Sequence, residues 1–271
     1  GLDVEIIHPS ATINAIEFLK SGQADVVSHF LVTAITARAE GIPMVNIAQL
    51  SQHSAIMLVS MKSSGIETIQ DFEGRKIGVW MSGFEEVPKA MMIEHGLTVE
   101  FVPILWSVNL FLLGGLDLMT VMWYNEYNQL YLSGINHDEL NTFFLKDYGY
   151  DIPEDGLYTL LHTLEQRPED LRAFTEATLR GWEYVSRNKD AAIDLVIEKM
   201  RALKIPSNKA HQSWMLDRVL ELLDPEDKDL LPGQLLEADF NLATGVLKER
   251  GIIKGSCSFH DFYKPVLPGR K

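Results

Sequence analysis

Short apolar strands alternate with helical segments over the first fifty residues of the chain. The spacing predicts a strand over residues 1–8, a helix over 11–21, a strand over 24–27, a helix over 31–40 and a strand over 44–50. Such a series is typical of a doubly wound α/β sheet, in which helices cover both faces of the strands. Because the first residues already alternate as a strand, we expect a further segment in front of them.

Residues 76–86, KIGVWMSGFEE, read as a buried strand, a turn of small residues and the start of a helix. Backbone N–H groups at such a turn have no helical partner, so a bound ligand can accept hydrogen bonds from them. We therefore expect the functional site at this turn. The alternative is that Ser82 only caps the helix that follows.

The remaining pattern predicts a second α/β region and a helical C-terminal part. Residues 51–60 are extended and mark a first crossing between lobes, with its hinge expected at residues 55–59. Residues 148–158, with two glycines and a proline, mark the return. From residue 167 onward the apolar stripes indicate helices packed on a core. We predict a discontinuous first lobe of residues 1–60 and 157–271 and a second lobe of residues 61–156.

The composition excludes several classes of function. A formal net charge of -14 argues against binding to nucleic acid or to an anionic membrane surface, since both need clustered Lys and Arg. No apolar run approaches the roughly 18 residues of a membrane span. Cys257 is the only cysteine, so the chain forms no internal disulfide.

No sequence motif for catalysis or cofactor binding is present. The chain lacks a nucleophile elbow, a phosphate-binding loop, a dinucleotide fingerprint and an HExxH pair. The eight histidines are not at metal-ligand spacing from one another or from the cysteine, so we expect neither a metal nor a cofactor. The adjacent Glu154 and Asp155 are either a paired acid/base device or a solvated turn before Gly156.

Polar and aromatic residues follow three of the predicted strands, at the ends that face the ligand crevice in open parallel sheets. They supply rings, hydroxyls, an amide and a carboxylate but no Lys or Arg, which favours a neutral or weakly cationic flat heterocycle over an anion. Its rings would stack on the aromatic side chains and its N–H donors would meet a carboxylate. The predicted ligand-binding residues are Ser28, His29, His53, Trp80, Ser82, Gly83, Phe84, Tyr124, Asn125, Glu126 and Asp155.

Several short segments are also familiar in their order along the chain: GLDVEI at 1–6, SGQAD at 21–25, ARAEGIP at 37–43, GRKIGVW at 74–80, YNEY at 124–127, DGLYT at 155–159, GWEY at 181–184 and HQSWM at 211–215. Together they resemble the substrate-binding proteins of ABC importers. The branch is the one related to thiamine-pyrimidine synthesis proteins, which includes binders of riboflavin and of pyrimidine precursors. The resemblance covers nearly the whole chain.

The resemblance implies a two-lobed periplasmic-binding-protein fold of type II that closes over a solute and delivers it to a membrane permease. We then expect a non-catalytic monomer that binds a thiamine pyrimidine or a riboflavin-like vitamin. Its location would be periplasmic or extracytoplasmic, with a lipid anchor as an option on a segment outside this chain. Two departures stand out: family members carry a strand and a helix before the equivalent of Gly1, and their turn at Ser82 and Gly83 is richer in glycine.

Two other functions fit the same resemblance. The fungal branch synthesises the thiamine pyrimidine with a cysteine-rich run, a reactive histidine and a lysine-bound pyridoxal cofactor. Here Cys257 stands alone, so that chemistry lacks its parts. A ligand sensor with the same fold is the third reading, because function resides in the site rather than in the fold.

Overall fold

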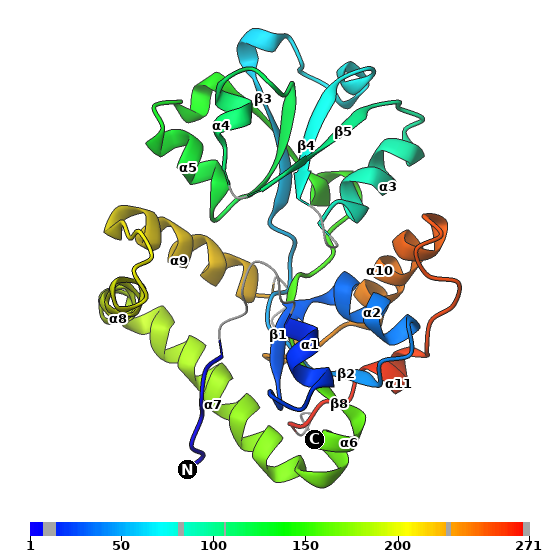
Figure 1. Cartoon of the computed structure of the whole chain (residues 1–271), viewed down its shortest axis with the longest axis vertical. Helices are drawn as coiled ribbons and strands as arrows, with labels where there is room; N and C mark the ends of the chain where they lie inside the picture. The colour runs from blue at the N-terminus through cyan, green and yellow to red at the C-terminus, as the bar shows by residue number, and fades with distance from the viewer. Residues whose placement is uncertain (8–14, 81–83, 106, 226–228, 268–271) are drawn as a thin grey trace. The chain divides into compact units, whose positions relative to one another are not determined.

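The computed structural model describes residues 1–7, 15–80, 84–105, 107–225 and 229–267, which form two compact units (Figure 1). The chain passes from unit one to unit two twice and returns twice, so each unit combines segments that are far apart in the sequence. Unit one comprises Gly1–His53, Ile152–Arg187 and Leu223–Lys271, and unit two comprises Ser54–Asp151 and Asn188–Leu222.

Unit one is built on a three-stranded sheet with the order β1-β8-β2. Strand β8 (Asp155–Leu160) lies between β1 (Val27–Phe30) and β2 (Met44–Gln49) and is antiparallel to both. Its first residues therefore lie beside the last residues of the two early strands. The core on this sheet includes Val45, Ile47, Ala48, Leu157 and Leu171.

Helices pack on both the sheet and one another in unit one. Helix α2 contacts α10, and α11 contacts β2. Helix α7 begins with a proline followed by two acidic residues, which suit the geometry and the dipole of a first helical turn. The described helices of this unit are α1 (Ala15–Lys20), α2 (Leu31–Ala39), α6 (Leu161–Gln166), α7 (Pro168–Arg187), α10 (Glu237–Glu249) and α11 (Phe259–Phe262).

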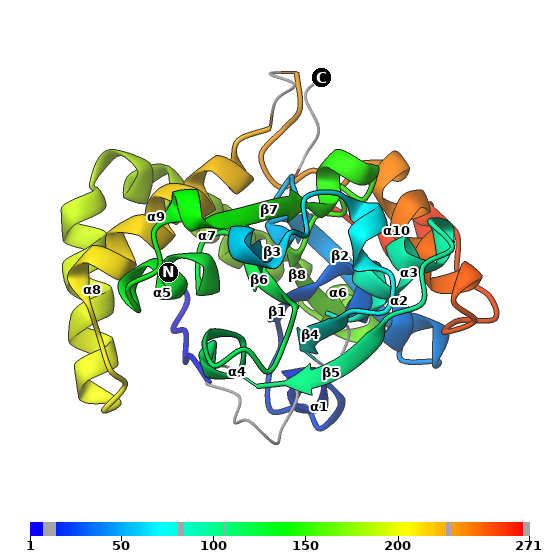
Figure 2. The same ribbon diagram turned by 90° about the horizontal axis from the view of Figure 1, so that it is seen from above.

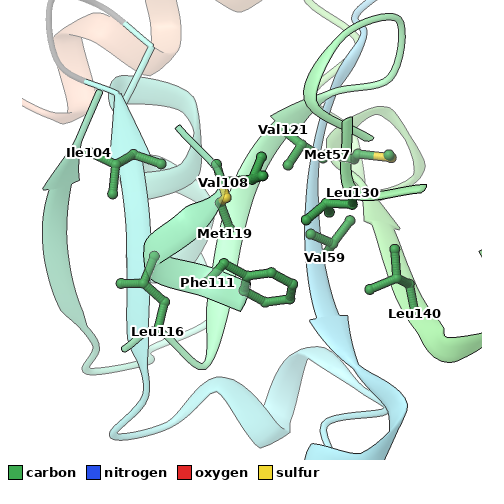
Figure 3. Packing of buried hydrophobic residues seen from close by; sticks show 10 residues of the cluster. All are labelled: Met57, Val59, Ile104, Val108, Phe111, Leu116, Met119, Val121, Leu130 and Leu140. Carbon is green, nitrogen blue, oxygen red and sulfur yellow. The ribbon is translucent and has the colours of Figure 1, made fainter. Parts of the chain in front are cut away.

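Unit two contains a five-stranded mixed sheet with the order β5-β4-β6-β3-β7. Strand β4 is parallel to β5 and β6, and β3 is antiparallel to β6 and β7. The strands are β3 (Ile56–Met61), β4 (Lys76–Trp80), β5 (Glu100–Ile104), β6 (Leu118–Met122) and β7 (Leu140–Phe144). Figure 3 shows the buried cluster between the sheet and its helices, formed by Met57, Val59, Ile104, Val108, Phe111, Leu116, Met119, Val121, Leu130 and Leu140.

Two late helices, α8 and α9, belong to unit two. Figures 1 and 2 both show α9 on the same side of this unit as α5. The helices of this unit are α3 (Glu86–Glu94), α4 (Asn109–Leu112), α5 (Glu126–Leu132), α8 (Lys189–Ala202) and α9 (Lys209–Leu223), with short 3-10 turns at Lys62–Ser64, Ile69–Phe72, His137–Glu139 and Leu145–Tyr148.

The structure corrects three sequence-based expectations. Residues 1–7 do not form a strand: they have no regular secondary structure and are exposed, and no described strand pairs with them. Strand β1 begins at Val27, so Ser28 and His29 lie inside the strand and not after it. Residues 55–59, predicted as the hinge of the first crossing, fall largely within β3, where residues 57–60 are buried and pair with strands on both sides.

The doubly wound parallel sheet expected from the first fifty residues is not what unit one contains. Its described strands pair only in antiparallel fashion, because β8 separates β1 from β2. The periodicity of a sequence indicates where strands form, but not that a strand from a distant segment will insert between two of them. The predicted domain boundaries stay a prediction; the two units differ from them chiefly in that Asn188–Leu222 packs with unit two.

The packing around Gly156 yields a first prediction. A Cβ at this position would lie 2.7 Å from Gln49 Oε1, 2.7 Å from the Tyr158 hydroxyl and 2.8 Å from Asn46 Nδ2. We expect Gly156→Ala to lower the free energy of unfolding by about 1–3 kcal/mol, as overpacking does. Thermal and urea unfolding measure the change.

Gly181 in α7 is the matched control, because a Cβ there meets nothing within 4 Å. Gly181→Ala should be neutral or stabilising by up to about 1 kcal/mol. Equal melting temperatures for the two variants would contradict the packing described around Gly156.

Candidate functional site

The predicted site residues fall into two sets, one in each unit. Ser28, His29, His53 and Asp155 belong to unit one, and the aromatic residues with Asn125 and Glu126 belong to unit two. Ser82 and Gly83, which form the turn where the functional site was predicted, lie outside the described residues. Each set is built from the end of one or more strands.

In unit one the strand register brings Ser28, His29 and Asp155 to one edge of the sheet. Phe30 pairs with Asp155, and His29 pairs with Gly156. Because side chains alternate along strands, Ser28 and Asp155 lie on one face, whereas His29 lies on the opposite face. The three predicted residues are therefore neighbours along the edge, but only Ser28 and Asp155 share a face.

The Asp155 carboxyl at this edge has a pKa that departs from its ordinary value. Burial raises its pKa to about 6, an effect that a hydrogen bond from the Ser28 hydroxyl partly offsets. Its backbone oxygen accepts hydrogen bonds from the N–H groups of Leu50 and Ser51 at 2.9 and 3.0 Å. These bonds fix the backbone that presents the carboxyl.

The preceding residue, Glu154, is 5% exposed, and its backbone oxygen accepts the Leu31 N–H at 2.9 Å. The pair Glu154-Asp155 is thus not a solvated turn: Glu154 is buried and Asp155 opens strand β8. Of the two alternatives for this pair, the structure removes the solvent-exposed one.

His29 is held as a neutral hydrogen-bond donor. Its Nδ1 accepts the backbone N–H of Phe30 at 2.8 Å, so the neutral ring carries its proton on Nε2. Burial lowers the pKa of His29 to about 4. At neutral pH the side chain is therefore uncharged, with Nε2–H as its donor.

Three further polar residues on the His29 face escaped the sequence analysis. Asn46, Gln49 and Tyr158 are fully buried, and Gln49 Oε1 accepts from Asn46 Nδ2 at 3.0 Å and from the Tyr158 hydroxyl at 3.5 Å. Gln49 Nε2 in turn donates to the Asp155 backbone oxygen at 3.0 Å. The sequence did contain a signal for these buried polar residues, because Asn46 and Gln49 are two amides inside an otherwise apolar strand.

In unit two the aromatic pair Trp80 and Phe84 lies at the end of β4. Their ring centroids are 5.6 Å apart at 73°, and Trp80 Nε1 donates to the Leu105 backbone oxygen at 3.2 Å. The two rings meet edge to face. Both residues are half-buried, so part of each ring is accessible. This pair is a candidate stacking surface for a flat ligand.

Glu126 and Asn125 start α5 and are linked to each other. Glu126 is 6% exposed; its Oε2 accepts the Met122 N–H at 3.1 Å and its Oε1 accepts from Asn125 Nδ2 at 2.8 Å. Burial raises the pKa of Glu126. Both carboxylate oxygens are thus used within the chain, and Glu126 anchors the loop between β6 and α5.

The same loop is attached to α9 by residues that the sequence analysis missed. Asn125 Oδ1 accepts from His211 Nε2 at 3.1 Å, and Trp214 Nε1 donates to the Trp123 backbone oxygen at 3.1 Å. The Arg218 guanidinium lies 4.8 Å from the Trp123 ring centroid and 5.0 Å from that of Trp214, a double cation–π contact. Tyr124, the remaining predicted residue of the loop, is half-buried.

Neither a metal centre nor a membrane-spanning helix is found in the described part of the chain. Its His, Cys, Asp and Glu side chains form no group of three that could hold a metal ion. Among the described helices, none combines the length and the apolar character needed to cross a bilayer. His53, the last predicted residue, is half-buried just before β3.

Comparison with known proteins identifies the fold. A sequence model described as NMT1/THI5 like matches residues 1–192. The periplasmic aliphatic sulphonate binding protein of Escherichia coli superposes with a TM-score of 0.68 at 15% identity, covering 94% of this chain and 81% of that one. The chain therefore has the two-lobed periplasmic-binding fold, as predicted.

Two relatives differ in how much of the chain they match. The formylaminopyrimidine-binding protein of Halalkalibacterium halodurans is 23% identical over 231 residues, which are 83% of this chain and 69% of that protein. A 4-amino-5-hydroxymethyl-2-methylpyrimidine phosphate synthase of Saccharomyces cerevisiae is 32% identical over only 79 residues, 29% of this chain and 23% of the synthase. The similarity to the binding protein is thus the more extensive of the two.

The raised pKa of Asp155 predicts a pH-dependent stability. A carboxyl whose pKa is higher in the folded protein than the ordinary value of 3.8 makes folding less favourable as the pH rises towards about 6. We expect Asp155→Asn to raise the melting temperature above pH 6 but not near pH 4. The gain should be on the order of 1 kcal/mol after allowance for partial exposure.

Asp25→Asn is the control, because Asp25 is an exposed carboxylate that pairs with Arg167 at 2.8 Å. It should show no gain in stability between pH 4 and pH 7. A melting difference between Asp155→Asn and the unmodified protein that stays constant over this range would show that Asp155 is not desolvated.

Proposed function

Because the chain belongs to the NMT1/THI5-like family, we propose that it is the solute-binding component of an ABC importer, and that its solute is a small uncharged aminopyrimidine of the thiamine-precursor class. The partner that receives the solute is a membrane permease, and the location is extracytoplasmic.

The observation that carries this proposal is the Asp155 carboxyl beside Ser28 at the sheet edge of unit one. A partly desolvated carboxylate is a strong acceptor for the N–H donors of an amino-substituted ring. The predicted site residues include no Lys or Arg that would favour a phosphate or a sulfonate. An amino group on a neutral ring fits this chemistry.

The name of the Halalkalibacterium halodurans relative supports a pyrimidine over riboflavin, the other vitamin expected from the resemblance. A synthase is the less favoured alternative. The synthase similarity covers less than a third of the chain, and Cys257 is the only cysteine. We therefore propose binding without turnover.

Calorimetric titration tests the proposal. We expect 4-amino-5-hydroxymethyl-2-methylpyrimidine or its formylamino analogue to bind with nanomolar to micromolar affinity and to be recovered unchanged by mass spectrometry. Riboflavin should bind at least about tenfold more weakly, a difference of 1.4 kcal/mol. Failure of both pyrimidines to bind, or their conversion, would refute the proposal.

Asp155→Asn should weaken pyrimidine binding by about tenfold or more, because a hydrogen bond to a charged group is replaced by one to a neutral amide. Asp25→Asn, at an exposed carboxylate of the same unit, should leave the affinity unchanged. Glu126→Gln tests whether the second buried acid also binds the solute. Unchanged affinity would assign Glu126 to the loop between β6 and α5 and not to the solute.

A further inference from the structure

Unit two contains a hollow of about 400 Å³ between α5 and the junction of α8 with α9. We call it the α5–α9 pocket. Its volume falls within the roughly 300–1,000 Å³ of small-molecule sites. Its lining includes Asn125, Gln129, Leu132, Met200, His211 and Met215.

The α5–α9 pocket is lined by both apolar and polar side chains. Leu132, Met200 and Met215 supply apolar surface, and the amides of Asn125 and Gln129 supply hydrogen-bonding groups. Small-molecule sites combine apolar surface with placed polar groups in this way. The thioethers of the two methionines adapt to flat rings and make favourable contacts with them.

None of the described residues that line this pocket carries a formal charge at neutral pH. A neighbouring hollow of about 330 Å³ differs in this respect: it is lined by Asp194, Glu198, Arg201 and Lys209, and Lys209 pairs with Asp194 at 2.7 Å. An ionic ligand in the α5–α9 pocket would leave water without a compensating charge, which is costly. The pocket therefore selects for an uncharged ligand.

Polar side chains that line the pocket are held in place by a hydrogen-bonded network. His211 Nδ1 accepts from Asn128 Nδ2 at 2.9 Å, and its Nε2 donates to Asn125 Oδ1 at 3.1 Å, which fixes a neutral imidazole. Burial lowers the pKa of His211, in agreement with this form. The network orients the polar groups before a ligand arrives.

Gln129 has hydrogen-bonding capacity left over. Its Nε2 donates one proton to Asn125 Oδ1 at 2.9 Å. The second amide proton and Oε1 of Gln129 have no partner among the described side chains. A carboxamide on the ligand would match this donor and acceptor with its own acceptor and donor.

We propose that the α5–α9 pocket binds a small uncharged aromatic amide, with its ring between the two methionines and its carboxamide on Gln129. This site lies wholly within unit two and goes beyond the capture of the imported solute. It also gives a role to Asn125, which was predicted from the sequence as a residue of the solute site.

Benzamide and benzoate form a matched pair of probes, since they share a ring and differ in charge. In the full chain with ¹³C-methyl methionine, benzamide should shift the methyl signals of Met200 and Met215 and leave those of the buried Met57 and Met119 in place. Saturation should give a dissociation constant on the order of 1 mM, typical of so small a ligand. Benzoate should cause no such shift.

Met200→Trp fills the pocket, and Leu195→Trp makes the same change at an exposed position of the same helix. The first variant should abolish the benzamide shift of Met215, and the second should retain it. The proposal is overturned if benzamide leaves Met200 and Met215 unchanged, if benzoate shifts them equally, or if Met200→Trp binds like the unmodified chain. Should Met200→Trp fail to fold, the two probes on the unmodified chain decide.

Discussion

The insertion of β8 between β1 and β2 is the constraint on which unit one depends. Its antiparallel direction places Asp155 beside Phe30 and beside the end of β2. Gln49 then secures the arrangement from the side, through its bond to the Asp155 backbone oxygen. A buried amide in an apolar strand is costly unless it is paired, so the segment that pairs with Gln49 has one favourable register. The Asp155 carboxyl, which is proposed to bind the solute, is thus positioned by the same hydrogen bonds that hold the sheet together.

In unit two a helix, and not a strand, holds the candidate site residues in place. The loop after β6 ends in Asn125, whose side chain is shared between Glu126 on one side and His211 of α9 on the other. The stacked Arg218 and the Trp214 N–H bond add to this attachment. In both units a segment from late in the chain completes a polar cluster that begins at the end of an early strand.

This arrangement explains what the sequence could and could not predict. Helix α2 and strand β2 were predicted almost to the residue, because each has its own apolar period and a clear end. Pairing has no such local signature: 83 residues separate Asn128 from His211, which share a hydrogen bond. The sequence therefore indicated which residue types are available for a site, but not that Asn46, Gln49 and His211 would hold them in place.

The ionisation of the buried groups bears on binding as opposed to catalysis. Acid–base catalysis near neutral pH needs side chains whose pKa lies close to the working pH. Burial lowers the pKa of His29 to about 4, away from neutral pH, and raises the pKa of Tyr158 above its ordinary value of 10.0. Both side chains are consequently fixed as uncharged hydrogen-bonding groups over the physiological range. Asp155, with a pKa of about 6, is the exception, and at neutral pH it is mostly an acceptor. Preformed groups such as His29 and Tyr158, which do not exchange protons near neutral pH, suit hydrogen bonding to a neutral ring.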